Sequence, residues 1–217
     1  DVVGGFKPDQ FRALPPKAVG GFRPDQFAEL PNDVVSEFKE DQFEALSPEA
    51  FGGFQKGHIK KLPKKLFANF GLDEFKQLSP DAMGGFNPQT FRELPPDAIV
   101  GFKSDQIAAL RPKVVGALQI DQFEALPSDA FSGFKAGHIK KLPKDFFAEF
   151  EPKAFQKLSP EALEGLNVDQ FEALPGEVIG ELSADQMENL KPSMFIGIQP
   201  ATFESLPKSA FGGFQSE

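Results

Sequence analysis

A leucine stands at every sixteenth position of this chain, with no insertion or deletion to disturb the spacing. A short tandem repeat cannot bury its apolar side chains alone, so each unit must be stabilised by the units beside it. We therefore expect one continuous array over residues 1–217, beginning and ending inside a unit like a piece of a longer array. The repeated leucines are Leu14, Leu30, Leu46, Leu62, Leu78, Leu94, Leu110, Leu126, Leu142, Leu158, Leu174, Leu190 and Leu206.

Each sixteen-residue unit consists of two octets of related pattern. First-type octets resemble SPDAMGGF at Ser79–Phe86, and second-type octets resemble RPDQFAEL at Arg23–Leu30. Ser is a preferred N-cap, Pro is favoured at the first helical position, and Pro disfavours helical geometry in the residue before it. Each octet is thus predicted to form one helix of about two turns that ends where the next octet begins.

Other repeat structures fit this pattern poorly. The apolar residues do not alternate with a period of two, and the regular prolines would interrupt a strand ladder or a long helix. The predicted fold is an all-α solenoid with no β-sheet, in which the two octets of each unit form one rung and like residues stack on like. A coil turn of more than two helices is the alternative, and it would shorten the rod.

The apolar positions predict a core rich in phenylalanine. The chain has 26 Phe but no Trp and no Tyr, and Phe alone suits dry packing better than a polar binding surface. First-type octets often carry Gly at positions six and seven, which indicates close backbone approach or a tight helix ending. An exposed lipid or peptide groove is the alternative role for the phenylalanines that end these octets. They are Phe22, Phe38, Phe54, Phe70, Phe86, Phe102, Phe134 and Phe150.

A longer period of eighty residues relates GHIKKLP at 57–63 to GHIKKLP at 137–143. It reflects either duplication of a block of five units or a structural period, and the sequence does not separate the two. His58 and His138 are the only histidines, and each occupies a position where second-type octets usually carry Gln. Two ligands of one metal ion must lie within a few ångströms of each other, so histidines five units apart are expected to have a surface or cap role.

Asp and Gln recur at the third and fourth positions of second-type octets. An acidic residue in the first turn stabilises the helix dipole, and Gln can bond back to the cap or form a ladder between rungs. Calcium binding is the alternative for the Asp set, although equivalent residues one rung apart are too distant to supply its six or so oxygen ligands. The residues are Asp9, Asp25, Asp41, Asp73, Asp105, Asp121, Asp169 and Asp185, with Gln10, Gln26, Gln42, Gln106, Gln122, Gln170 and Gln186.

Charge and composition exclude several classes of function. The net charge of −9 argues against a nucleic-acid partner, and no apolar run is long enough to span a membrane. Two basic clusters stand out, and we expect them to be solvated faces or partners of neighbouring carboxylates, with docking of an acidic partner as the alternative. They are Lys60, Lys61, Lys64 and Lys65, and Lys140, Lys141 and Lys144.

Catalysis has few candidate residues. The chain has no Cys. Its Ser and His residues show no triad-like spacing, and its carboxylates are evenly distributed. The recurring GGF lacks the strand and the Lys that a phosphate-binding loop requires. We therefore expect no enzymatic activity and no cofactor.

Octets such as SPEAF, SPDAM, KPDQFRAL and SPEALEGLNVDQFEAL resemble the short Leu-(Ser/Thr)-Pro-Glu tandem repeats of some very large bacterial secreted or surface proteins. The resemblance covers nearly the whole chain, which departs from that pattern in its Phe and Gly-Gly content. It implies a structural spacer within a giant exported protein, with neighbouring repeats as partners, and it supplies no active-site residue. The alternative function is a binding module that holds a protein, a glycan or Ca²⁺ on one face of the solenoid.

Overall fold

The computed structural model describes residues 3–196 and 199–208, and all regular secondary structure in this part of the chain is helical. Each octet forms one helix, as its pattern predicts. In α8 (Pro80–Met83), Pro80 begins the helix and the Ser79 hydroxyl accepts a hydrogen bond from the Ala82 N–H at 3.2 Å. The helices are four to six residues long in most octets, and η1 has three. They are shorter than the two turns expected, because the chain must return to extended geometry at each following cap.

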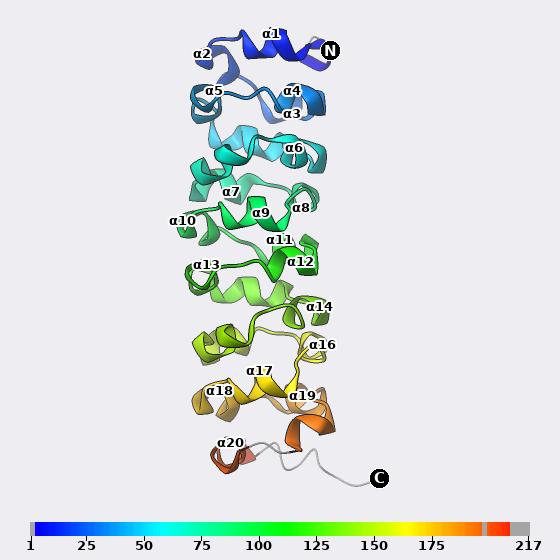
Figure 1. The fold of residues 1–217 in the computed structure, drawn as a ribbon, viewed down its shortest axis with the longest axis vertical. Coiled ribbons are helices and arrows are strands. Elements are labelled where there is room, and N and C mark those ends of the chain that lie inside the picture. Colours follow the sequence, from blue (N-terminus) through cyan, green and yellow to red (C-terminus); the bar gives the residue numbers. More distant parts are fainter. Residues whose placement is uncertain (1–2, 197–198, 209–217) are drawn as a thin grey trace.

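The helices wind into a rod with three helices in each turn of the coil (Figure 1). Every helix contacts the helix three places further along the chain, so the helices form three columns. The first column contains α1 (Pro8–Arg12), α4 (Asn32–Val35), α6 (Lys56–Lys61), α8, α11 (Ser104–Ala109), η4 (Ser128–Gly133), α15 (Pro152–Phe155), α18 (Gly176–Gly180) and α20 (Pro200–Glu204).

The other two columns complete the walls of the rod. The second contains α2 (Pro16–Val19), α5 (Glu40–Glu44), η3 (Lys64–Asn69), α9 (Pro88–Arg92), α12 (Pro112–Val115), α14 (Ala136–Ile139), α16 (Pro160–Leu163) and α19 (Ala184–Glu188). The third contains η1 (Val3–Gly5), α3 (Pro24–Ala28), η2 (Pro48–Gly53), α7 (Leu72–Gln77), α10 (Pro96–Ile99), α13 (Ile120–Glu124), η5 (Lys144–Glu149), α17 (Val168–Glu172) and η6 (Pro192–Phe195).

The expected rung of two helices is therefore wrong, and so is the stacking of like residues on like. Because octet types alternate and a turn contains three octets, each first-type helix contacts second-type helices above and below. Three walls enclose the phenyl rings on every side, which a layer of two facing helices would not do. The alternative of more than two helices per turn is the arrangement observed.

The columns wind slowly around the rod. In the second column, α2 and α5 lie at the left edge of Figure 1, α9 lies near the middle, and α12, α14 and α16 lie at the right edge. As a result α6 and α14, which carry the two copies of GHIKKLP, lie along the same edge although they belong to different columns. The eighty-residue period thus returns these segments to one side of the rod.

The core is one continuous cluster of apolar side chains that runs the length of the rod from Val3 to Leu206. Leu14 and Phe22, near the N-terminal end, are half-buried. The other repeated leucines are between 2% and 7% exposed, and Phe38, Phe54, Phe70, Phe86, Phe102, Phe134 and Phe150 are at most 4% exposed. Rings contact across turns, with Phe27 and Phe54 stacked at a centroid distance of 4.4 Å.

In several first-type octets the glycine at the seventh position provides space for the neighbouring turn. A Cβ atom on Gly53 would overlap the carbonyl oxygen of Pro24, and one on Gly133 would overlap that of Ser104. A Cβ atom on Gly85 would lie 2.5 Å from the carbonyl oxygen of Lys56. Close backbone approach therefore explains these glycines, whereas Gly212 and Gly213, which share the pattern, lie outside the described residues.

None of the helices in residues 3–196 and 199–208 is long and apolar enough to cross a membrane.

Candidate functional sites

In five second-type octets the Gln at the fourth position is buried and joins two turns of the coil. In Gln122, which is 1% exposed, Oε1 accepts a hydrogen bond from the Gln119 N–H at 3.0 Å at the start of its own helix. Its Nε2 donates to the carbonyl oxygens of Phe91 at 3.1 Å and Leu94 at 2.7 Å, in the turn before. We call this set of three hydrogen bonds a glutamine bridge.

The same bridge recurs along the rod with the same spacing. Its donors always reach carbonyl oxygens 31 and 28 residues earlier in the chain. Both roles that the sequence left open for Gln, a bond back to the cap and a ladder between turns, are therefore filled by one side chain. Bridges are made by Gln42, Gln106, Gln122, Gln170 and Gln186, whereas Gln10 and Gln26 show only the cap bond among the described residues.

His58 and His138 make the same connection with an imidazole ring. The Nδ1 of His58 accepts a hydrogen bond from the Gln55 N–H at 3.1 Å, and its Nε2 lies 2.8 Å from the carbonyl oxygen of Leu30. Because Nδ1 must accept, the ring is the neutral tautomer with its proton on Nε2. His138 repeats this geometry with Lys135 and Leu110. The cap role is confirmed, but a surface position is wrong, since both rings are 1% exposed.

Burial determines the titration of both histidines. Desolvation lowers the pKa of His58 below its usual 6.5, and the bond to the Leu30 carbonyl opposes this in part. The pKa of His138 is lowered mainly by burial as well, with the Leu110 carbonyl opposing and the charge of Lys135 adding to the decrease. Protonation would place an N–H on Nδ1 opposite the backbone N–H that it now accepts. The neutral form is therefore the one that fits between the turns.

The Asp set lies on the surface at the starts of helices. Asp9, Asp25, Asp41, Asp73, Asp105, Asp121, Asp169 and Asp185 are all exposed and each lies in the first turn of its helix. The carboxylates of Asp41 and Asp121 each accept a bond from the backbone N–H of the next residue at 2.9 Å. Arg23 lowers the pKa of Asp25 through a side-chain hydrogen bond. Within the described residues, no three His, Asp or Glu side chains are grouped as a metal site.

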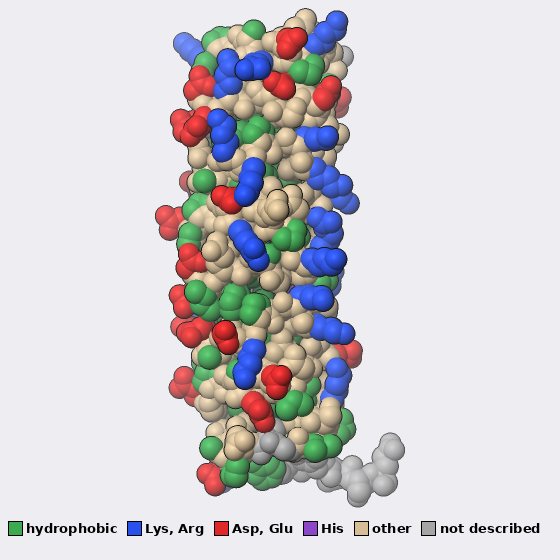
Figure 2. Space-filling view, in the orientation of Figure 1, with side chains coloured by type: hydrophobic (Ala, Val, Ile, Leu, Met, Phe, Trp, Pro, Cys, Tyr) green, Lys and Arg blue, Asp and Glu red, His purple; other side chains and the backbone are tan. Residues whose placement is uncertain are grey.

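The basic residues form an edge that the sequence presents only as separate clusters. Figure 2 shows Lys and Arg side chains along the edge where α6, α12, α14 and α16 lie, with Asp and Glu gathered at the opposite edge. Lys141 lines a shallow hollow with Arg111 and Lys113, and Lys140 lines the next one with Lys191. We call these five residues the basic edge.

The other basic residues of the two sequence clusters have different surroundings. Lys64 and Lys65 are ion-paired with Glu93 at 3.0 Å and Glu40 at 3.9 Å in adjacent turns. Lys60, Lys61 and Lys144 are exposed. The expectation that the clusters include charge partners of neighbouring carboxylates therefore fits Lys64 and Lys65.

Four second-type octets lack a glutamine or histidine bridge because another residue occupies the fourth position. These residues are Glu74, Thr90, Ala154 and Thr202. Thr90 still caps its own helix through a 3.1 Å bond from the Asn87 N–H to Oγ1, but its side chain is too short to reach the preceding turn. Sequence reasoning missed the significance of these exceptions. Comparing them with the regular Gln positions, octet by octet, is the signal that could have identified them.

Comparison with models of known protein families and with curated protein sequences finds no match for this chain.

Proposed function

We propose that this array is a structural spacer, a stiff rod within a larger exported protein. The observation that carries this proposal is the single core, which runs along the axis of the rod from Val3 to Leu206 without interruption. A core of this form provides length, and it does not gather side chains around one central cavity as most enzymes do.

The polar contacts between turns support the same function. Each glutamine bridge closes two carbonyl acceptors of one turn with a donor from the next, in a setting from which water is excluded. Buried hydrogen bonds of this kind are costly to break without replacement, since the freed groups lose their partners. Bending the rod at a bridge would strain these bonds, so the bridges favour a rigid spacer over a flexible linker.

Small-angle X-ray scattering of the purified chain tests this proposal. With three helices per turn and about 9–10 Å between packed helices, the rod should be ~80 Å long, with a radius of gyration of ~25 Å. A globular chain of the same length would give ~17 Å. Added Ca²⁺ should change neither value, because the exposed Asp residues are not grouped. A radius near the globular figure, or compaction on adding Ca²⁺, would contradict a rigid spacer.

The basic edge favours a second candidate function, the binding of an anionic partner such as an acidic protein or glycan. Arg111, Lys113, Lys140, Lys141 and Lys191 concentrate positive charge on one side of a chain whose net charge is −9. Glu164 lines the same surface and lowers its charge there. The chain should bind immobilised heparin at low salt, and the K113E/K141E variant should not. Equal retention of the two proteins would contradict this function.

A further inference from the structure

The turn that begins at α15 has an open cavity where a glutamine bridge would lie. Ala154 occupies the fourth position of this octet, so no side chain reaches the carbonyl oxygens of Phe123 and Leu126, which lie 31 and 28 residues earlier. In five other turns the equivalent two carbonyls hold an amide nitrogen at 2.7–3.2 Å. A cavity of about 120 Å³ lies here, lined by Ala154, Phe123 and Leu126 among others.

Each of the two carbonyl oxygens at this cavity accepts one hydrogen bond fewer than its counterpart in a bridged turn, among the described residues. The Phe123 oxygen accepts one bond, from the Leu126 N–H at 3.1 Å, and the Leu126 oxygen accepts none. In the bridged turns the oxygen equivalent to that of Phe123 accepts the same local bond and a glutamine donor as well, as the Phe91 oxygen does. A carbonyl oxygen has two lone pairs, so both oxygens can accept a further donor. The cavity can therefore accept hydrogen bonds from an N–H donor.

The side chains at the rim of the cavity are acidic and favour a positively charged ligand. In the bridge at Gln122, the rim positions are occupied by Arg92, Ala117 and Gln119, and Arg92 and Gln119 bond to backbone oxygens of adjacent turns. At the cavity, residues 32 positions later, the same places are Glu124, Glu149 and Glu151. All three carboxylates are exposed, and none has an ion-pair partner among the described residues.

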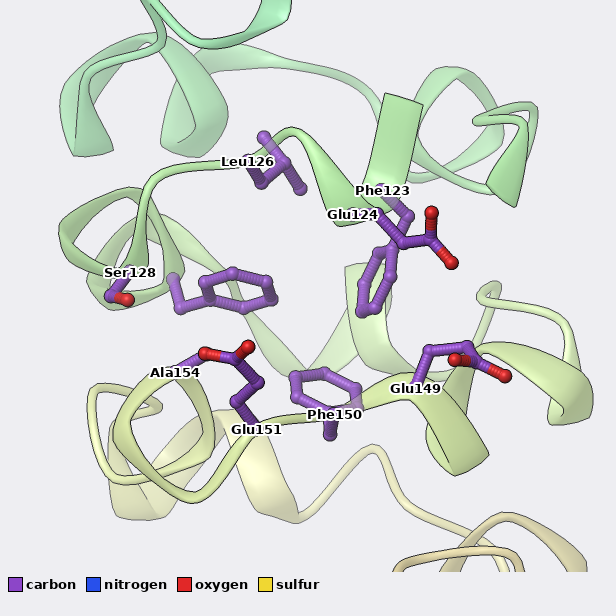
Figure 3. Close-up of a pocket in the computed structure, with 9 residues that line it drawn as sticks. Phe123, Glu124, Leu126, Ser128, Glu149, Phe150, Glu151 and Ala154 are labelled. Atoms are coloured by element: carbon purple, nitrogen blue, oxygen red, sulfur yellow. The ribbon is translucent and has the colours of Figure 1, made fainter. Parts of the chain in front are cut away.

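The remaining walls are aromatic and also favour a cation. Phe123 and Phe150 lie between the carboxylates, with Glu124 and Glu149 on one side and Glu151 on the other (Figure 3). The rings of Phe123 and Phe150 are 5.0 Å apart and nearly perpendicular. A phenyl face attracts a cation placed against it, and more strongly where water is excluded.

We infer that the cavity beside Ala154 binds a primary alkylammonium group. Two of its three N–H groups would donate hydrogen bonds to the carbonyl oxygens of Phe123 and Leu126, and the third would face the carboxylate of Glu151. The alkyl arm would lie against the exposed parts of the phenyl rings that line the cavity. The same chemistry is offered by a free aliphatic amine and by the lysine side chain of a partner protein.

The test is an amide NMR titration of the whole chain at constant ionic strength. The free amine is n-butylammonium chloride, and the lysine source is Nα-acetyl-lysine amide, whose side-chain ammonium group is free. Either ligand should shift the backbone amides of Leu126, Ala154 and Phe155 at millimolar concentrations. Shifts with butylammonium alone would mean that the cavity binds small free amines, and shifts with both would mean that it also binds lysine side chains. No shift with either would overturn the inference, and so would equal affinity for propionamide or tighter binding of Ca²⁺.

Two variants establish where the ligand binds. A154Q supplies the missing bridge and should weaken butylammonium binding ~10-fold or more, the equivalent of about 1.4 kcal/mol, while raising the melting temperature. E124Q/E151Q leaves the cavity open and removes most of its charge, and it should weaken binding of butylammonium several-fold without restoring the bridge. Unchanged affinity in A154Q, with its circular dichroism spectrum intact, would show that the amine binds elsewhere.

Discussion

The Nε2 atom of Gln122 lies 2.7 Å from the carbonyl oxygen of Leu94, which precedes it by 28 residues and belongs to the turn before. A side chain that the sequence places at the start of a short helix therefore fixes the distance between two turns. Each bridge is polar, buried and complete, and no side-chain nitrogen or oxygen buried in the described residues lacks a hydrogen-bond partner.

Replacement of a bridging glutamine should destabilise the rod. In Q122A the carbonyls of Phe91 and Leu94 and the N–H of Gln119 would each lose a hydrogen bond. We expect a loss of ~2–4 kcal/mol in the free energy of unfolding, measured by urea denaturation followed by circular dichroism. Q10A is the matched control, because Gln10 is exposed and makes only its cap bond, and it should cost ~1 kcal/mol or less. Equal losses in the two variants would show that the bridge itself adds nothing.

The two histidines should make stability depend on pH. Both have a pKa lowered by burial, so the unfolded chain takes up protons more readily than the folded chain. Their contribution is complete above the unfolded value near 6.5 and is lost as the pH falls below it towards the lowered pKa of the folded state. Urea denaturation at pH 7.5 and pH 5.5 should therefore give a lower midpoint at the acidic value.

The matched control for this effect is H58Q/H138Q, which installs the residue that other octets use for the bridge. Its bridges carry no titrating group, so its unfolding midpoint should change less than that of the natural sequence between the same two pH values. Parallel pH profiles would mean that the carboxylates, and not the histidines, control the response.

Adjacent glycines should respond in opposite ways to a single methyl group. In G53A the new Cβ would overlap the carbonyl oxygen of Pro24, so the turns must separate, at a cost of ~1–3 kcal/mol. In G52A the nearest atom is the Gln77 carbonyl oxygen at an ordinary 3.7 Å, and alanine should leave stability unchanged or raise it by up to ~1 kcal/mol. Calorimetric melting of the two variants provides the comparison, and a harmless G53A would exclude close approach as the reason for glycine.

Truncation of a core leucine should be costly in the middle of the array. Leu110 is 4% exposed, and L110A should lower the free energy of unfolding by ~2–5 kcal/mol, since a cavity is left in the core. The control is I120A, because Ile120 is 41% exposed and should contribute under ~1 kcal/mol. Similar denaturation midpoints for L110A and the natural sequence would argue against a tightly packed interior.

Local structure could be predicted from the sequence because it depends on residues within one octet. Ser79 and Pro80 start a helix through their own hydrogen bonds and backbone angles, and the spacing of Met83 and Phe86 sets the buried face. The number of helices per turn depends on how successive helices are angled at each cap, such as Asn87. That angle results from packing with turns 25 to 31 residues away, so a sixteen-residue period is a poor guide to it.

The candidate sites were less predictable for a related reason. Gln122 and His138 could be assigned to helix caps from spacing alone, but their burial follows from the turn below, which the octet pattern does not specify. Ala154 is inconspicuous in sequence, because alanine is common at the same position of first-type octets. Its importance appears only once the carbonyls of Phe123 and Leu126 are known to face that position in a bridged turn.

The odd number of helices per turn restricts how such an array can change in length. Loss of one octet would shift every later helix by one column relative to the earlier ones. At the junction, first-type helices would then meet first-type helices and bridging glutamines would meet the wrong carbonyls. Loss or gain of a pair would preserve both contacts. Recombination between repeats should therefore be tolerated in steps of whole sixteen-residue units. The length of such a rod can then change with the number of repeats in its gene, while the packing of its interior stays the same.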